Sequence, residues 1–451
     1  MKKILGILVF VMFCLSRTVV LAAESIDKVI KSSPINKGAV FVSVKDLNSG
    51  KNIYSHNSNS PVNPASTQKL ITLAASLDTL GEDYKFTTEL YKSSANELYL
   101  KLSADPFLSS KDLGKLLETA KSKNIIEPKN VYIDDYILDD MQWGEGWQWD
   151  DDLNPLMPKF GSYNIDDNLV KVVIKPTTPK APADIFTEKF YPVGFVNRVV
   201  TGGYDDVNIS HNQSISENLV EISGVVKEQI TRSIPASNIK RYFKLRLDEA
   251  FTNNKIIFYG KIYQKKLPTT NVYLVDKVEH NISDAVSAIL QDSNNMMAET
   301  VFKLAGGKFV NNTGSVDSAI LMLNDYCRKH NLNTANIRIV DGSGVSKNNL
   351  MTADFMTDFL IELSKQENFE SLKENMATPG KGTLSNRMLY FHDNLRAKTG
   401  TLSNVSSIAG YIKTQKGRNL AFDIVINDPK SQSNNKKQLE EMILRAIYMN
   451  Y

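Results

Sequence analysis

The chain has 451 residues, more than a single hydrophobic core usually organises, so we expect two or more domains. Its formal net charge is only +3, which gives no reason to expect a nucleic-acid partner. The remaining composition is ordinary for a globular protein, with 42% hydrophobic and 23% charged residues.

The first 23 residues have the pattern of a secretory signal peptide. Lys2 and Lys3 precede an apolar run at residues 4–15, and the small residues Ala22 and Ala23 mark a cleavage site. The alternative is an uncleaved membrane anchor, which the short and interrupted apolar run disfavours. We therefore expect an exported protein, located in the periplasm or on the outer face of the cytoplasmic membrane.

Residues 39–54 predict a β-hairpin. Val40, Val42 and Val44 alternate with polar positions before a turn at residues 48–50, and a second strand follows the turn.

A helix is predicted soon after this hairpin. Leu70, Leu73, Leu77 and Leu80 recur at helical spacing, which indicates one buried face, and Gly81 is a suitable stop signal.

The middle of the chain has a different sequence pattern, in which short strand-like runs separated by turn residues dominate. We expect strands at Phe86–Tyr91, Glu97–Leu102, Asn130–Ile133, Leu169–Ile174, Asn218–Val226, Arg241–Leu247 and Lys255–Tyr263. We therefore interpret residues 87–269 as a β-rich insertion with its own core.

Helical periodicity returns after the insertion, and the chain ends in three strand patterns and a helix. Helical segments are expected from residue 286 through 304 and at residues 317–329, 354–365 and 436–448, and the expected strands are residues 395–402, 405–412 and 419–427. These strands and the N-terminal hairpin can form one antiparallel sheet with helices on both sides. The predicted fold is an α/β (α+β) catalytic domain, built from residues 24–86 and 270–451 and interrupted by residues 87–269.

The start of the helix after the hairpin carries a serine and a lysine three residues apart, Ser66 and Lys69. A helix N-terminus favours developing negative charge, and an amine whose pKa is lowered by burial can activate a neighbouring hydroxyl. The Ser-x-x-Lys pattern alone is weak, because it also occurs at Ser25, Ser237 and Ser433. Only the Ser66 pattern opens an apolar helix and has suitable partners downstream.

Two downstream motifs are the partners of Ser66. Ser293-Asn-Asn295 lies between two helical segments, and Lys398-Thr-Gly-Thr401 lies on a predicted edge strand. A glycine within that strand would let a ligand backbone approach closely.

Other catalytic patterns are absent from the sequence. It has no His-Glu-x-x-His, no Gly-x-Ser-x-Gly and no glycine-rich phosphate loop, and its five histidines lack metal-ligand spacing. We therefore predict neither a metal nor a cofactor.

The order Ser-x-x-Lys, Ser-x-Asn, Lys-Thr-Gly is the signature of penicillin-interactive serine acyl transferases. The chain resembles one group of them, the D-alanyl-D-alanine carboxypeptidase/endopeptidases of the class C low-molecular-mass penicillin-binding proteins. The resemblance extends over nearly the whole mature chain, and includes a large insertion between the first two motifs. It also includes Ala104-Asp-Pro106, Gly146-Trp-Gln-Trp-Asp-Asp151, Asp341-Gly-Ser-Gly-Val-Ser346 and Thr378-Pro-Gly-Lys-Gly-Thr383.

The resemblance implies a fold, a substrate and a set of roles. The fold would be a penicillin-binding/β-lactamase-like transpeptidase core, the substrates would be peptidoglycan stem peptides, and β-lactam antibiotics would be acylating inhibitors. Ser66 would form an acyl-enzyme with Lys69 as base, and Ser293 would relay a proton. Asn295 would hold the substrate amide. The backbone N–H groups of Ser66 and Thr401 would form the oxyanion hole. The terminal carboxylate would bind at Lys398, Thr399, Gly400 and Thr401.

The same resemblance suggests where the substrate side chain binds. Asp166 is similar to a position that holds the free amine of a stem peptide, and Lys347 stands where relatives often carry arginine. All three tryptophans (143, 147 and 149) lie together, either as an aromatic anchor that docks the insertion or as a wall of the substrate cleft.

Two other functions remain as alternatives, a β-lactamase and a catalytically idle wall-binding protein. The long interval from Lys69 to Ser293 disfavours the first, because it is far shorter in β-lactamases of similar core, and the complete motifs disfavour the second. The sequence leaves open the balance of carboxypeptidase and endopeptidase activity, the third residue of the stem peptide and the oligomeric state.

Overall fold

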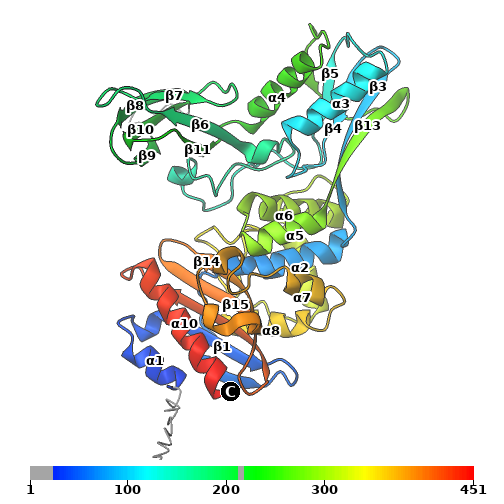
Figure 1. Ribbon diagram of the computed structural model, residues 1–451. Helices are drawn as coiled ribbons and strands as arrows, with labels where there is room; N and C mark the ends of the chain where they lie inside the picture. Colours follow the sequence, from blue (N-terminus) through cyan, green and yellow to red (C-terminus); the bar gives the residue numbers. More distant parts are fainter. Residues whose placement is uncertain (1–23, 212–217) are drawn as a thin grey trace, which may run out of the picture.

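The computed structural model describes residues 24–211 and 218–451. They form a core of one sheet between helices, and an insertion that rises from the core on two long strands (Figure 1). The predicted signal peptide, residues 1–23, lies outside the described residues. Within the described part of the chain, no helix has the length and apolar character needed to cross a membrane.

The core sheet joins the two ends of the chain, as predicted. Its five strands pair antiparallel throughout. In spatial order they are β14 (Leu395–Thr401), β15 (Val405–Lys413), β16 (Asn419–Asn427), β1 (Val40–Asp46) and β2 (Asn52–His56). β14, which carries the Lys-Thr-Gly motif, is an edge strand of this sheet, as expected.

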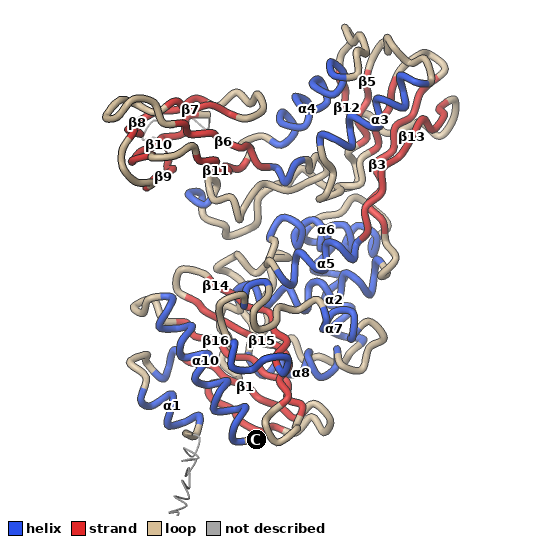
Figure 2. The backbone as a smooth tube through the Cα atoms, in the orientation of Figure 1, coloured by secondary structure: helices blue, strands red, loops and turns tan. Residues whose placement is uncertain are grey.

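Helices cover both faces of the core sheet (Figure 2). On one face, Val40, Val42 and Val44 pack into a cluster with α1 (Ile26–Ser32) and α10 (Ser433–Asn450). On the other face, residues of β15 and β16 join a second cluster with the remaining core helices. These are α2 (Lys69–Leu80), α5 (Ile282–Gln291), α6 (Asn295–Val310), α7 (Val316–Lys329), α8 (Ala353–Leu363) and α9 (Phe369–Glu374).

Helix α2 is more deeply buried than its leucine pattern indicates. The prediction of one buried face is wrong, because Ile71, Thr72, Ala75 and Ser76 are buried as well. α2 contacts α5, α6 and α7, so little of its surface meets water. Gly81 ends the helix at a φ of 87°, a conformation that favours glycine.

The insertion leaves the core along β3 (Lys85–Ser93) and returns along β13 (Val272–Asn281). These strands pair antiparallel from Lys85 opposite Asn281 to Ser93 opposite Val272. They belong to a second five-stranded sheet with β4 (Leu98–Lys101), β5 (Val131–Asp134) and β12 (Ile262–Gln264), and the apolar side chains of this sheet cluster with α3 (Ser110–Ser122) and α4 (Ile239–Asn253). The division of the chain at residues 87 and 269 stays a prediction.

An arm of two three-stranded sheets extends from this part of the insertion over the core (Figure 1). One sheet contains β11 (Ile230–Pro235), β6 (Leu169–Lys175) and β7 (Asp184–Thr187), and the other contains β8 (Gly194–Thr201), β10 (Leu219–Val226) and β9 (Asp206–His211).

Two predicted strands of the insertion are wrong. Residues 241–247 lie within α4, where Tyr242, Phe243, Leu247 and Ala250 are buried at helical spacing and Asn238 caps the first turn. Most of residues 255–263 is irregular, and only its end belongs to β12. Aromatic and β-branched residues in short runs do not distinguish a strand from a buried helix.

Candidate active site

Ser66 lies in a short 3₁₀ turn, Ala65–Gln68, that runs directly into α2. Ala65 has a φ of 49°, a left-handed conformation that is uncommon for residues with a side chain and that concentrates at functional sites. Its N–H donates to Asn63 Oδ1 at 2.8 Å, which holds the turn. Ser66 is half-buried whereas the other residues from 62 to 70 are buried, so this turn meets solvent at Ser66.

Lys69 is fully buried, and its Nζ lies among three oxygen acceptors. The distances are 2.8 Å to Ser66 Oγ, 2.7 Å to Asn295 Oδ1 and 2.6 Å to the Ser343 carbonyl oxygen. An ammonium has three protons and can donate to all three, but a neutral amine has two protons and a lone pair. On deprotonation, therefore, one contact must reverse, and Ser66 is the partner with a hydroxyl proton to donate.

Burial lowers the pKa of Lys69 to about 7, because the charged amine has lost its water. The negative charges of Asp341 and Glu299 oppose this effect and raise the pKa of Lys69. Near neutral pH the amine can therefore take up or release a proton, which a solvated lysine with a pKa of about 10.4 does not do.

Lys398 is also fully buried, although a lysine on an edge strand would ordinarily be solvated. Its Nζ donates to Ser293 Oγ at 2.8 Å and to the Thr399 carbonyl oxygen at 2.7 Å. Burial, and then repulsion from Lys69, lower the pKa of Lys398 well below its usual value, whereas Asp292 raises it. Ser293 thus bonds to Lys398, with Lys69 nearby.

Gly400 allows β14 to lie against the turn that carries Ser66. A Cβ at this position would be 2.8 Å from the Ser66 nitrogen and 2.3 Å from Ser407 Oγ, so any side chain would separate the two elements. Leu402 exchanges backbone hydrogen bonds with Val405 of β15. Because backbone groups alternate along an antiparallel strand, the N–H of Thr401 points to the open edge of β14, where Ser66 lies.

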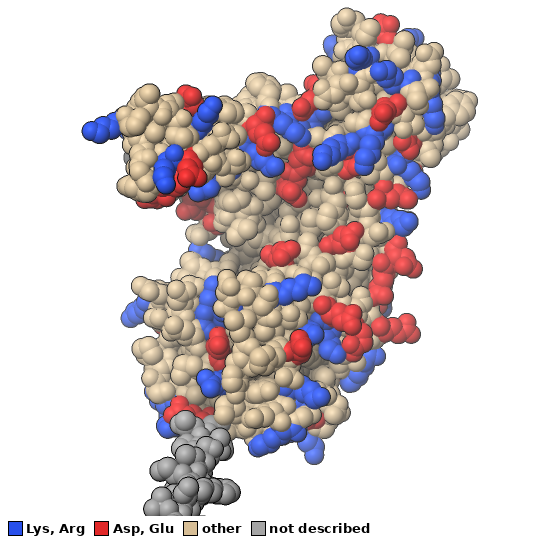
Figure 3. Space-filling model, in the orientation of Figure 1, with Lys and Arg blue, Asp and Glu red and all other residues tan. Residues whose placement is uncertain are grey.

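A cavity of about 290 Å³ opens beside Ser66. Both parts of the molecule line it, because Asn295 and Thr401 come from the core and Trp147, Asp151 and Leu156 come from the insertion. The space-filling view shows a hollow between the insertion and the core (Figure 3).

Trp147 is both the anchor and the wall that the sequence left as alternatives. Its indole Nε1 donates to Asp341 Oδ2 at 2.9 Å in the core, and its ring lines the cavity. The Asp341 carboxylate also accepts backbone N–H groups of Gly344 (2.9 Å) and Ser346 (2.6 Å), which fixes the loop beside Lys69. Trp149, by contrast, is 76% exposed.

Asp166 does not lie in the Ser66 cavity. Its carboxylate accepts the Ser110 N–H at 2.9 Å at the start of α3, the Ser110 hydroxyl, and Lys189 Nζ at 3.1 Å. It lines another cavity, of about 800 Å³, whose lining shares no residue with that of the Ser66 cavity. The structure therefore does not bring Asp166 together with the other predicted site residues.

Asp151 is a cavity-lining residue that the sequence reasoning missed. It lines the Ser66 cavity together with Lys347, and Lys347 Nζ donates to Gln148 Oε1 at 2.7 Å. Burial, and then Asp150, raise the pKa of Asp151, and the charge of Lys347 lowers it. The only signal in the sequence was its place within the tryptophan-rich segment of the resemblance.

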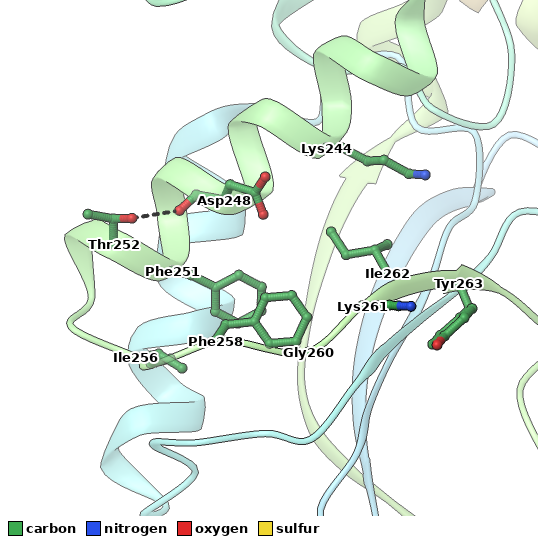
Figure 4. A pocket seen from close by; sticks show the side chains of 10 residues that line it. All are labelled: Lys244, Asp248, Phe251, Thr252, Ile256, Phe258, Gly260, Lys261, Ile262 and Tyr263. Carbon is green, nitrogen blue, oxygen red and sulfur yellow. Dashed lines mark hydrogen bonds between the residues drawn. The ribbon is translucent and has the colours of Figure 1, made fainter.

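The insertion also contains a cavity of about 640 Å³ between α4 and β12, lined by Lys244, Phe251, Phe258 and Tyr263 among others (Figure 4). It contains none of the predicted catalytic residues. Across residues 24–211 and 218–451, no group of three or more His, Cys, Asp or Glu side chains is arranged to hold a metal ion.

Comparison with known proteins shows similarity over almost the whole chain. Residues 22–446 match the profile described as the D-Ala-D-Ala carboxypeptidase 3 (S13) family. The chain is 26% identical over 440 residues to D-alanyl-D-alanine carboxypeptidase of Actinomadura sp. (strain R39), covering 90% of this chain and 80% of the relative. It is 23% identical over 402 residues to D-alanyl-D-alanine carboxypeptidase DacB of Haemophilus influenzae, covering 85% and 84%.

Solved structures show the same fold. Penicillin binding protein 4 (dacB) of Haemophilus influenzae superposes with a TM-score of 0.83 at 22% identity, covering 94% of this chain and all of that one. A predatory endopeptidase of Bdellovibrio bacteriovorus, solved in complex with an immunity protein, gives a TM-score of 0.51 at 15% identity, covering 91% and 93%.

We expect the Nζ of Lys69 to titrate near pH 7, from ammonium below to amine above, because burial lowers its pKa. NMR of protein labelled with ε-¹³C lysine measures this titration, and the Lys69→Met variant assigns the resonance by its disappearance. A Lys69 resonance that titrates near 10 would contradict the expectation.

Proposed function

Because the chain belongs to the D-Ala-D-Ala carboxypeptidase 3 (S13) family, we propose that it removes the terminal D-Ala of peptidoglycan stem peptides through an acyl-enzyme on Ser66. It is a serine peptidase that acts on the cell wall. The observation that carries the assignment of Ser66 is its contact with Lys69, a buried amine 2.8 Å from its Oγ.

Acylation begins with transfer of the Ser66 hydroxyl proton to the neutral amine of Lys69. Ser66 Oγ then attacks the carbonyl carbon of the penultimate D-Ala. The resulting oxyanion accepts hydrogen bonds from the backbone N–H groups of Ser66 and Thr401, each worth about 3 kcal/mol in the transition state. Asn295, fixed by Lys69 and by its own bond to the Leu156 carbonyl (2.8 Å), holds the substrate amide.

Departure of the terminal D-Ala requires a proton on its nitrogen. Ser293, bonded to Lys398, relays this proton to the leaving amine, and the Lys69 ammonium replaces it. In the second half of the cycle, Lys69 accepts a proton from water as the water attacks the acyl carbon. Ser66 recovers its hydroxyl proton, and the shortened peptide leaves with a free carboxylate.

The terminal carboxylate of the substrate binds along β14. Lys398 supplies the positive charge and Thr401 an exposed hydroxyl, and Gly400 keeps the strand close to Ser66. Thr399 is buried and shares a hydrogen bond with the Thr383 hydroxyl (2.7 Å), which positions this part of the strand.

The side chain of the stem peptide extends toward the insertion. Asp151 and Lys347, one negative and one positive, line the cavity next to Ser66. They fit an amine and a carboxylate at the end of a long substrate side chain, and we assign them this role in place of Asp166. A partly desolvated pair of this kind contributes more than an exposed one.

Two further properties follow from the proposed reaction. β-Lactams would acylate Ser66, and the Haemophilus influenzae relative has been solved in complex with one. The substrate lies outside the cytoplasmic membrane, so the enzyme must be exported, and residues 1–23 would direct this export.

Ser66→Ala is expected to abolish labelling by fluorescent penicillin and D-Ala release from a D-Ala-D-Ala pentapeptide, because the variant lacks the hydroxyl that contacts the Lys69 amine. Ser237→Ala is the matched control and should keep both activities. Gel fluorescence and mass analysis of digested sacculi measure them and separate carboxypeptidase from endopeptidase products. Persistent labelling of Ser66→Ala would refute the assignment. Rapid hydrolysis of the penicillin adduct in the wild-type enzyme would indicate a β-lactamase.

A substrate carboxylate should bind together with a proton, because its charge raises the lowered pKa of Lys398. Affinity for the carboxylate should therefore fall as the pH rises through the pKa of Lys398 in the free enzyme. Calorimetry of Ser66→Ala with a D-Ala-D-Ala peptide, in buffers of different ionisation enthalpy, measures proton uptake. The methyl ester of the same peptide should take up none, and equal uptake by both ligands would contradict the role of Lys398.

Asp151→Asn should lower kcat/KM about tenfold for a stem peptide with a free side-chain amine, because a charge-assisted hydrogen bond is lost. The N-acetylated peptide should respond little. Asp166→Asn is the matched control and should leave both peptides unaffected, since Asp166 lies in the other cavity. The assignment fails if Asp151→Asn affects both peptides equally.

A further inference from the structure

Glu299 is a fully buried carboxylate on α6, four residues after Asn295. Within residues 24–211 and 218–451 no lysine, arginine or histidine nitrogen lies within 4.0 Å of it. Its two oxygens instead accept backbone N–H groups, from Gly342 at 2.9 Å and from Ser343 at 2.8 Å. A carboxylate in such a place is costly to bury, and its negative charge raises the pKa of Lys69.

The loop that Glu299 binds is the one that touches Lys69. The N–H of Ser343 donates to Glu299, and the C=O of the same residue accepts from Lys69 Nζ at 2.6 Å. Gly342 lets this loop lie directly on α6, because a Cβ there would be 2.8 Å from Phe302 and 3.0 Å from the Ala298 carbonyl. One residue, Ser343, therefore connects the carboxylate to the amine.

We propose that Glu299 is a positioning residue that holds the Ser343 carbonyl against Lys69 and sets the pH at which Lys69 becomes a base. This inference rests on the proposed function of Lys69. The carboxylate acts by two physical means, the geometry of the loop and its negative charge in a buried site.

Two charged groups face Glu299. Asp341 lies on the loop that carries Gly342 and Ser343, and Lys69 lies on α2. Burial, followed by repulsion from Asp341, raises the pKa of Glu299 to about 7, and the bonds from Gly342 and Ser343 oppose this rise. When Glu299 is ionised, it stabilises the ammonium form of Lys69. Removal of its charge should therefore let Lys69 lose its proton at lower pH.

The test is the pH dependence of acylation by a fluorescent penicillin, followed by stopped flow. In Glu299→Gln, the acidic limb of the rate profile should shift to lower pH by roughly one unit, because a neighbouring negative charge is gone. The plateau should also fall about tenfold, because a carboxamide has one acceptor for two N–H donors. Glu299→Asp keeps the charge, so its limb should stay near the wild-type position while its plateau falls.

Glu440→Gln is the matched control. Glu440 is also a fully buried carboxyl with a raised pKa, but it pairs with Arg387 beneath the sheet, away from Lys69. Its replacement should leave the limb unchanged. If the limb of Glu299→Gln stays at the wild-type pH, whatever the loss of rate, Glu299 is only a structural residue and the proposal is overturned.

A second measurement does not require Glu299→Gln to fold. Coupling between two groups is reciprocal, so a carboxylate that raises the pKa of Lys69 must have its own pKa lowered by Lys69. Infrared titration of Lys69→Met should show one buried carboxyl titrating at higher pH than in the wild type, and an unchanged titration would refute the coupling. This result does not depend on acylation, whereas failure of penicillin to label Ser66 in the wild type would refute the proposed function itself.

Discussion

Burial of a lysine without a contacting carboxylate is the constraint on which the site depends. Across residues 24–211 and 218–451, no carboxylate oxygen lies within 4.0 Å of the Lys69 nitrogen, and its partners are a hydroxyl, an amide and a carbonyl. Hydrogen bonds without a contacting counter-charge leave the ammonium poorly stabilised, so the pKa falls into the range where proton transfer is useful. Each partner comes from a different segment, and the fold must therefore bring together the Ser66 turn, α6 and the loop after Asp341.

The insertion contributes walls to a cavity whose candidate catalytic residues all come from the core. Trp147 reaches across to Asp341, which also binds the backbone of the loop beside Lys69, so docking of the insertion and placement of Lys69 share one carboxylate. The main-chain carbonyl of Leu156 orients Asn295 in the same way. A change in the insertion can therefore alter the chemistry without touching a reacting atom.

The sequence predicts the parts of this site that follow a strict pattern of residue types. It does not predict the parts whose position depends on the path of the chain in three dimensions. The three motifs and the antiparallel sheet could be predicted, because residue types at fixed spacing define them. Asp166 was predicted at the cavity, but it binds the start of α3 instead, and Asp151 takes the place beside Lys347. No local pattern distinguishes these acids, because their positions depend on the irregular segment between β5 and β6. Glu299 was missed because its partners are backbone groups of a distant loop, and a backbone N–H does not require a particular residue type in the sequence.

The pairing of β3 with β13 has a consequence for how the chain folds. Two halves of the catalytic core are separated by about two hundred residues, and closing a loop of that length costs roughly 5 kcal/mol in chain entropy. Because Lys85 lies opposite Asn281, an insertion that folds first has already brought the two junctions to within the spacing of neighbouring strands. The two halves of the core can then assemble without the full entropy cost of closing a long loop. The same adjacency makes the insertion removable in principle, since a tight turn between these two residues would reconnect the core.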